Sequence, residues 1–364
     1  MQKERITDKQ AICLFISFII GSTLILGIGG EAENDAWLAT IAGIIMAVPM
    51  LLIYSRMLAL FPGKGLFDIL NITLGNLMGK VIALLYIMYV FHVGALVLRN
   101  FGEFINTVAM PETPIFVPLI CMGFLSIIAV RLGIEVLGRT ATYFLPIIFF
   151  ILLIVQMLAI PQLNLNYLKP VLGNGLVPVL KSGFAAFSFP FAETVVFIGV
   201  YGSLKTQKSP SKVYFLGILI SSIIVIITTI RNVGVLGNTL GNFYFPSYEA
   251  VSRINIGDSI ERIEVTVATV FIYGVFIKSS ICLLVACKGI GKVFRLKNYR
   301  SIVIQMGLIM VYFSYIVFDN CMEMKYWAFR VYPYYAFPFQ VIIPIIIWVL
   351  AEAKNKKFYS TEKE

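Results

Sequence analysis

The hydrophobic positions of this chain are gathered into long, continuously apolar runs separated by short polar stretches. Ten runs approach the roughly 20 residues that a helix needs to cross the apolar part of a bilayer. Helices are favoured over barrel strands because the runs are continuous, and because a helix satisfies its backbone hydrogen bonds within itself. The expected spans are 11–30, 38–60, 79–101, 114–130, 140–160, 176–202, 213–235, 265–287, 301–318 and 334–350.

Composition agrees with a membrane protein, since 59% of the 364 residues are hydrophobic and only 13% are charged. We therefore expect an all-α polytopic protein that forms a single transmembrane domain over 1–364. Its first repeat would cover about 11–160 and its second about 176–352, followed by a short cytoplasmic tail, 353–364. The N-terminal "MQKERITDKQ" leads into an apolar run without a small-residue cleavage pattern, so this run is interpreted as a retained span.

Basic residues gather on one side of the expected membrane. Alternate loops and both ends of the chain hold 20 of the 29 Lys and Arg residues, which places that side and both termini in the cytoplasm. The net charge of +10 is explained by this topology, and nucleic-acid binding loses its support.

On the opposite side, the aromatic run 326–339 is typical of an interface belt at the start of the last span. The segment 243–264 is either a lid over the outer mouth or a plain connector.

Two of the expected spans are interrupted at corresponding places, five spans apart. Span one contains Gly21, Ser22 and Thr23 in "FIIGSTLILGIGG", and span six contains "FSFPFAET", residues 187–194. Such a pair is typical of inverted-repeat carriers that bind ligand at two helix breaks near mid-membrane. Glycine permits a turn, and Ser22 or Thr23 would cap the outer half-helix so that its free N–H groups face an anionic group.

In span six, Pro190 fits the first turn of a new helix, and Glu193 would lie in that turn. Glu193 has two interpretations: its carboxylate complements the positive end of the half-helix, or it faces a cavity and serves a ligand, ion or proton.

Lys278, in the middle of span eight, could pair with an acid, occupy the place of a cation or extend toward the interface. His92, the only histidine, is either a packing residue or a proton or ligand contact. Arg99, Glu103, Arg231 and Asp319 are expected to be interface or ion-pair residues.

Catalytic and metal chemistry find no support in the sequence. One histidine excludes a centre with several histidine ligands, the five cysteines are scattered, and no Ser-His-Asp or Cys-His set is visible. We therefore expect no enzyme activity, no cofactor and no metal.

Seven short motifs occur in an order that resembles a known family. They are "ENDAWLAT", "FPGKG", "MPETP", "GIEVLGR", "FPFAE", "SIERIEV" and "FIKSS", spread over nearly the whole chain. Together they resemble the B subunits of spore germination receptors, the germinant receptor family within the amino acid-polyamine-organocation superfamily.

This resemblance implies a leucine-transporter-like fold of two inverted five-helix repeats, with helices 1 and 6 broken. It also implies residence in the inner membrane of spores, recognition of a small-molecule nutrient, and partnership with an A-type membrane subunit and a C-type lipoprotein subunit. Many relatives are expected to have a proline near the end of span one, where this chain reads "LGIGGEA". The implied ligand-binding residues are Gly21, Ser22, Thr23, His92, Phe187, Ser188, Phe189, Pro190, Glu193, Thr194 and Lys278.

Three functions remain open at this point. The chain could be a sensing subunit that binds a nutrient, with an amino acid as the first choice. It could instead be a secondary amino-acid transporter coupled to protons or ions, which needs the same pocket. A scaffold without a ligand is the third alternative.

Overall fold

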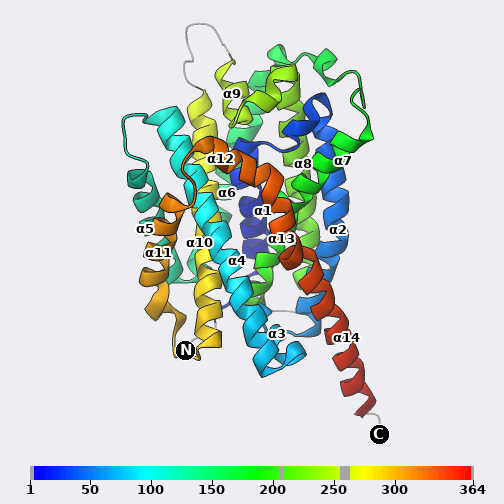
Figure 1. Ribbon diagram of the computed structural model, residues 1–364, viewed down its shortest axis with the longest axis vertical. Coiled ribbons are helices and arrows are strands. Elements are labelled where there is room, and N and C mark those ends of the chain that lie inside the picture. The colour runs from blue at the N-terminus through cyan, green and yellow to red at the C-terminus, as the bar shows by residue number, and fades with distance from the viewer. Residues whose placement is uncertain (1–3, 205–208, 255–262, 362–364) are drawn as a thin grey trace.

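The computed structural model describes residues 4–204, 209–254 and 263–361, which form a bundle of helices (Figure 1). The α-helices are α1 (Asp8–Leu26), α2 (Ala36–Leu60), α3 (Leu66–Leu74), α4 (Asn76–Phe104), α5 (Phe116–Leu132), α6 (Ile134–Ala159), α7 (Leu176–Ala186), α8 (Ser209–Leu236), α9 (Pro246–Ser252), α10 (Glu264–Val293), α11 (Val303–Ile316), α12 (Cys321–Tyr326), α13 (Tyr332–Phe337) and α14 (Ile343–Thr361). The shorter 3₁₀ and π-helical segments used below are η1 (Gly30–Asp35), η5 (Phe187–Phe191), η6 (Ala192–Gly199), η8 (Gly237–Asn242), η10 (Trp327–Val331) and η11 (Pro338–Ile342).

The predicted set of ten spans is confirmed in number and order. Within the described ranges, nine helical segments are long and apolar enough to cross a membrane, and the 17-residue α5 supplies the tenth apolar helix. The last span begins earlier than expected, because its helical segments run from Cys321 to Lys354 and not from Tyr334. The π-helical segments η10 and η11 lie within it, and the aromatic run is divided between buried residues such as Tyr332 and exposed ones such as Tyr326 and Tyr334.

Helices α1 and α10 form the centre of the bundle (Figure 1). Every residue of α1 from Leu14 to Leu26 is buried, as is every residue of α10 from Ile277 to Cys287. The two helices approach closely where Gly21 faces Gly274, since a Cβ atom on Gly21 would lie 2.3 Å from the Gly274 Cα. A pair of glycines at a helix crossing is a common way to bring two membrane helices together.

The predicted break of span one at Gly21, Ser22 and Thr23 is wrong. Helix α1 continues through these residues and ends at Leu26, after which Gly27 and Gly29 both adopt φ of 72°. The glycine at 21 serves helix packing, and the Thr23 hydroxyl donates to the Ile19 carbonyl within the same helix. The chain therefore leaves the first helix about one and a half turns later than expected, at glycines that tolerate a left-handed backbone.

The predicted break of span six is confirmed. Helix α7 ends at Ala186, and Phe189 has extended backbone angles (φ −128°, ψ 116°) inside the π-helical segment η5. Pro190 follows through a cis peptide bond, and η6 then begins at Ala192 with Glu193 in its first turn. Proline lacks an N–H group and interrupts the regular hydrogen-bond pattern here.

Both ends of the chain lie at the same end of the bundle, opposite the short helix α9 (Figure 1). The N-terminal segment is fixed there, because the Glu4 carboxylate lies 2.9 Å from Lys288 Nζ and 3.3 Å from Arg300 Nη2. Burial raises the pKa of Glu4, but the Lys288 charge and the hydrogen bond from Tyr299 lower it, and the net shift is downward. At the other end, the segment 243–264 contains the short helix α9, while residues 255–262 of that segment lie outside the described residues.

We expect Gly21→Ala to destabilise the protein, because the added methyl group would overlap the α10 backbone at Gly274. Overpacking of this kind costs about 1–3 kcal/mol. Gly30→Ala is the matched control, since a Cβ atom there has no neighbour within 4 Å and needs no positive φ. Unfolding midpoints of the purified proteins in detergent measure the difference, and equal midpoints would refute the proposed close packing.

Candidate functional site

Glu193 lies at the helix break of span six, with its carboxylate turned toward α10 and the last span. Lys278 Nζ contacts Glu193 Oε2 as an ion pair, and the Tyr332 hydroxyl donates to Glu193 Oε1. Both side chains of the pair are almost completely buried, with exposures of 0% for Lys278 and 3% for Glu193. The two oxygens of the carboxylate thus have separate partners from two different helices.

Lys278 is also held by α1 and by two aromatic rings. Its Nζ donates to Ser22 Oγ at 3.2 Å, and it lies 4.8 Å from the Phe18 ring centroid and 4.5 Å from that of Phe189. Aromatic faces attract a cation, so these contacts offset part of its desolvation. Of the three interpretations of Lys278, pairing with an acid is confirmed, and extension toward the interface is wrong because the side chain is fully buried.

A chain of hydrogen bonds links this ion pair to the middle of the last span. The Tyr332 hydroxyl lies 3.3 Å from that of Tyr89, which accepts from Gln340 Nε2 at 3.0 Å. Gln340 Nε2 also donates to the Ser188 carbonyl at 2.9 Å, and Ser188 Oγ donates back to Gln340 Oε1 at 3.0 Å. The broken span six is therefore joined to the last span on both sides of Pro190. A network this fully satisfied favours a single arrangement of the helices.

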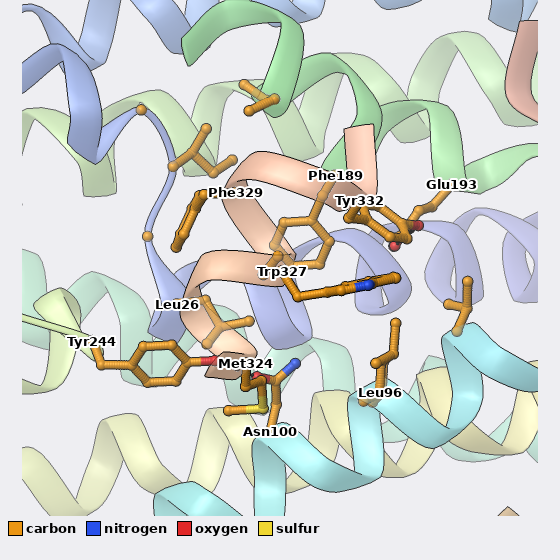
Figure 2. Close-up of a pocket in the computed structure, with 18 of the residues that line it drawn as sticks. Leu26, Leu96, Asn100, Phe189, Glu193, Tyr244, Met324, Trp327, Phe329 and Tyr332 are labelled. Atoms are coloured by element: carbon orange, nitrogen blue, oxygen red, sulfur yellow. Dashed lines mark hydrogen bonds between the residues drawn. The ribbon is translucent and has the colours of Figure 1, made fainter. Parts of the chain in front are cut away.

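A small central pocket lies beside the ion pair (Figure 2). Its volume is about 60 Å³, and its wall includes Glu193 together with the chain at Gly27, Ile28 and Gly29. Figure 2 shows the Phe189, Trp327 and Tyr332 rings close together, with Glu193 behind Tyr332. The aromatic wall consists of Phe189, Tyr244, Phe318, Trp327, Phe329 and Tyr332. Such a wall suits a small solute with an apolar part.

Ten of the eleven predicted site residues divide into four groups. Phe189 and Glu193 line the pocket directly, and Ser22 and Lys278 support Glu193 from behind. Gly21 packs against Gly274 of α10, and Thr23 bonds within α1. The four remaining predicted residues of the span-six motif are buried around the break: Phe187 stacks on Phe184, Ser188 bonds Gln340, Pro190 interrupts the helix, and Thr194 donates to the Phe191 carbonyl at 2.6 Å.

His92 lies outside the pocket wall, in a cage of aromatic rings. A hydrogen bond of 3.0 Å joins His92 Nδ1 to the Tyr335 hydroxyl, and the rings of Phe313, Trp327 and Tyr335 meet the imidazole edge to face. The packing interpretation describes this position better than a direct ligand contact. The His92 ring contacts the Trp327 ring, which lines the pocket.

Sequence reasoning missed Tyr332, Trp327, Gln340 and Tyr89. The first two belong to the aromatic run 326–339, which was interpreted as an interface belt. Gln340 carried a usable signal, because it is an isolated amide inside an apolar run and is completely buried. The prolines Pro333 and Pro338 of the same run also indicated an irregular helix.

Of the residues expected to pair near the span ends, Arg99 does so. Arg99 Nη2 lies 2.7 Å from Glu103 Oε1, within the buried part of α4. Arg231 is different, since its side-chain hydrogen bonds in the described structure go to the Asn232 amide oxygen and not to a carboxylate. In the part of the chain that the structure describes, no group of three or more His, Cys, Asp or Glu side chains could hold a metal ion.

A family model described as spore germination protein matches residues 5–320. The chain belongs to this family. Its relatives include spore germination protein KB of Bacillus subtilis (strain 168), which is 32% identical over 366 residues, 98% of this chain and 97% of that protein. Spore germination protein A2 of the same organism is 29% identical, with 80% of this chain and 79% of that protein covered.

Solved structures of the same fold confirm the leucine-transporter-like architecture. Mhp1, a nucleobase-cation-symport-1 family transporter in a closed conformation with bromovinylhydantoin bound, aligns with a TM-score of 0.66 at 12% identity over 97% of this chain and 92% of its own. MhsT in complex with L-phenylalanine gives 0.63 at 14% identity over 96% and 99%. These identities are too low to show more than the fold. The germination family member described here is thus an integral membrane protein with a transporter-like fold.

Removal of the Tyr332 hydroxyl should lower the free energy of unfolding, because Glu193 Oε1 loses its hydrogen-bond donor. A hydrogen bond to a charged group is worth about 1.5–3 kcal/mol, so Tyr332→Phe should cost that much. Tyr335→Phe is the matched control on α13, since its hydroxyl bonds the partly buried ring of His92 and not a carboxylate, and its loss should cost about 1 kcal/mol or less. Denaturant unfolding compares the two variants. Equal losses of stability would show that the hydrogen bond to Glu193 contributes no more than the one to His92.

Proposed function

We propose that this chain is the nutrient-sensing subunit of a spore germination receptor and that it binds a small solute in the central pocket. Membership of the spore germination family supports the sensing role. The pocket supports the binding role, because it lies between the end of α1 and the break of span six, near the middle of the bundle. The observation that carries the proposal is that Glu193, an acid buried at this depth, stands in the wall of that pocket.

An amino acid is the solute class that suits the pocket first. Helix α1 ends at Leu26, and the last carbonyl groups of a helix have no partner within it, which favours a cationic group such as an ammonium. The Glu193 carboxylate, which is paired with Lys278, is a further acceptor in the wall of the pocket. The aromatic wall would receive an apolar side chain. We propose that Phe189 and Glu193 contact the solute, while Ser22 and Lys278 set the position of Glu193.

Binding would act on the ensemble of conformations, because a ligand shifts an equilibrium toward the state that it contacts better. The segment η5–η6 is the element on which the solute would act, since it joins the pocket to the α10 ion pair and to the last span. Partner subunits would detect the change. We propose an A-type membrane subunit and a C-type lipoprotein subunit as these partners, in the inner membrane of the spore.

The proposed topology places both termini in the cytoplasm. Two observations support it: both ends of the chain lie at one end of the bundle (Figure 1), and 20 of the 29 basic residues were assigned to that side. We further propose a single transmembrane domain of two repeats, about 11–160 and 176–352. The similarity to Mhp1 favours a second candidate function, a secondary transporter coupled to protons or ions, which would use the same pocket.

Filling the pocket should abolish solute binding without unfolding the protein. Val97 lines the pocket, so Val97→Phe would occupy much of its volume. Val81→Phe is the matched control, because Val81 lies on the same helix with 46% of its surface exposed. We expect an amino acid to raise the unfolding midpoint of the wild type and of Val81→Phe, but not that of Val97→Phe.

The screen would use amino acids first, then sugars and nucleosides. If no solute stabilises the wild type, or if Val97→Phe responds as the wild type does, the central pocket is not the nutrient site. Reconstituted vesicles separate the two candidate functions: binding without uptake supports a sensor, whereas accumulation driven by an ion gradient supports the transporter.

A further inference from the structure

A second cavity of about 300 Å³ lies beside the central pocket, toward the α9 end of the bundle. The two share part of their walls, namely Leu26, Gly27, Ile28 and Phe329. Figure 2 shows the Phe329 ring to one side of the Phe189, Trp327 and Tyr332 rings. Phe329 and the end of α1 therefore separate the two spaces. We refer to this second space as the outer cavity.

The wall of the outer cavity is basic. Among the described residues that line it are Lys325 and Arg330, and none is an aspartate or glutamate. Lys325 Nζ donates to the neutral Gly241 carbonyl at 3.0 Å, and no carboxylate among the described residues forms an ion pair with it. Low-dielectric walls concentrate such a field and attract anions from solution.

A third cation, Arg231, lies behind this wall with only 3% of its surface exposed. Its Nε and Nη2 donate to Asn232 Oδ1 at 3.2 and 2.8 Å, and Asn232 lines the outer cavity. Asn232 Nδ2 in turn donates to Ser247 Oγ at 2.8 Å, which fixes the amide in this orientation. The ion pairs of the described chain give Arg231 no carboxylate. Among the described residues, its side chain is thus bonded to a neutral amide.

Arg99 is another buried arginine near this end of the bundle, and it is paired with a carboxylate. Its guanidinium has the Glu103 carboxylate at 2.7 Å and also donates to the Tyr315 carbonyl at 2.6 Å. A buried arginine left without a counter-charge is costly, and ionisable groups within membrane spans usually mark a ligand or ion path. Arg231 therefore points to an anion that the described protein does not itself supply.

We propose that the outer cavity is a second binding site, separate from the central pocket, for the carboxylate of a small organic solute. Lys325 would contact the carboxylate directly. The Arg231 guanidinium, which lies behind Asn232, would attract the carboxylate electrostatically. The apolar part of the solute would rest on Leu26 and Phe329, which also face the central pocket. This site does not depend on the nutrient assigned to the central pocket.

The test titrates the purified full-length protein with sodium butyrate at constant ionic strength, with sodium chloride as the replaced salt. Butyramide, a neutral molecule of similar shape, is titrated in parallel. We expect the unfolding midpoint to rise with butyrate and saturate, and to respond far less to butyramide. Arg231→Gln should weaken the apparent affinity for butyrate at least tenfold. Equal responses to butyrate, butyramide and chloride would overturn the proposal.

Because Arg231→Gln could fail to fold, a second variant keeps the test decisive. Asn232→Asp would place a carboxylate beside the Arg231 guanidinium and supply the missing counter-charge. We expect this variant to be at least as stable as the wild type without butyrate and to lose the butyrate response. An unchanged response in Asn232→Asp would contradict the proposal.

The central-pocket variant Val97→Phe separates the two sites. It should keep the butyrate response even if it loses nutrient binding, because Val97 does not line the outer cavity. Loss of the butyrate response in Val97→Phe, with the response intact in Arg231→Gln, would place the anion in the central pocket and overturn the outer site.

Discussion

The buried ion pair between Glu193 and Lys278 is the contact on which the rest of this site depends. A charge of either sign at this depth is expensive unless it is paired and hydrogen-bonded. Here the carboxylate belongs to the broken span six and the ammonium to the central helix α10, with Ser22 of α1 and Tyr332 of the last span completing the shell. Four spans that are far apart in the sequence are thus fixed to one another at a single point.

The ion pair also determines the chemistry of the central pocket. Because Lys278 holds one carboxylate oxygen and Tyr332 the other, Glu193 presents a compensated charge to a mainly aromatic space. A solute that attracts Glu193 would compete with these partners and pull on α10 and the last span together. A nutrient could in this way alter a large part of the bundle through a small contact, which is what a sensing subunit requires.

Much of the fold was predictable from the sequence, because long apolar runs have few alternatives in a membrane. Glu193, Pro190 and Lys278 were also predictable, since each is costly in an apolar helix without a partner or a purpose. The break of span one was misplaced because glycine has two uses that look alike in a sequence: Gly21 lets α10 approach, while Gly27 and Gly29 let the chain turn. Only the neighbouring helix distinguishes them. Tyr332 was missed because aromatic residues near a span end resemble an interface belt until their direction is known.

A double-mutant cycle measures the central contact most directly. Free energies of unfolding would be compared for the wild type, Glu193→Gln, Lys278→Met and the double variant, in detergent or bicelles. Each single change leaves a buried partner without its counter-charge, at a cost of about 3–5 kcal/mol, whereas the double change removes both charges. The account predicts that the double variant loses clearly less stability than the sum of the two single losses, with a coupling of about 2 kcal/mol or more. Additive losses would show that Glu193 and Lys278 do not form a coupled pair, and would contradict the account.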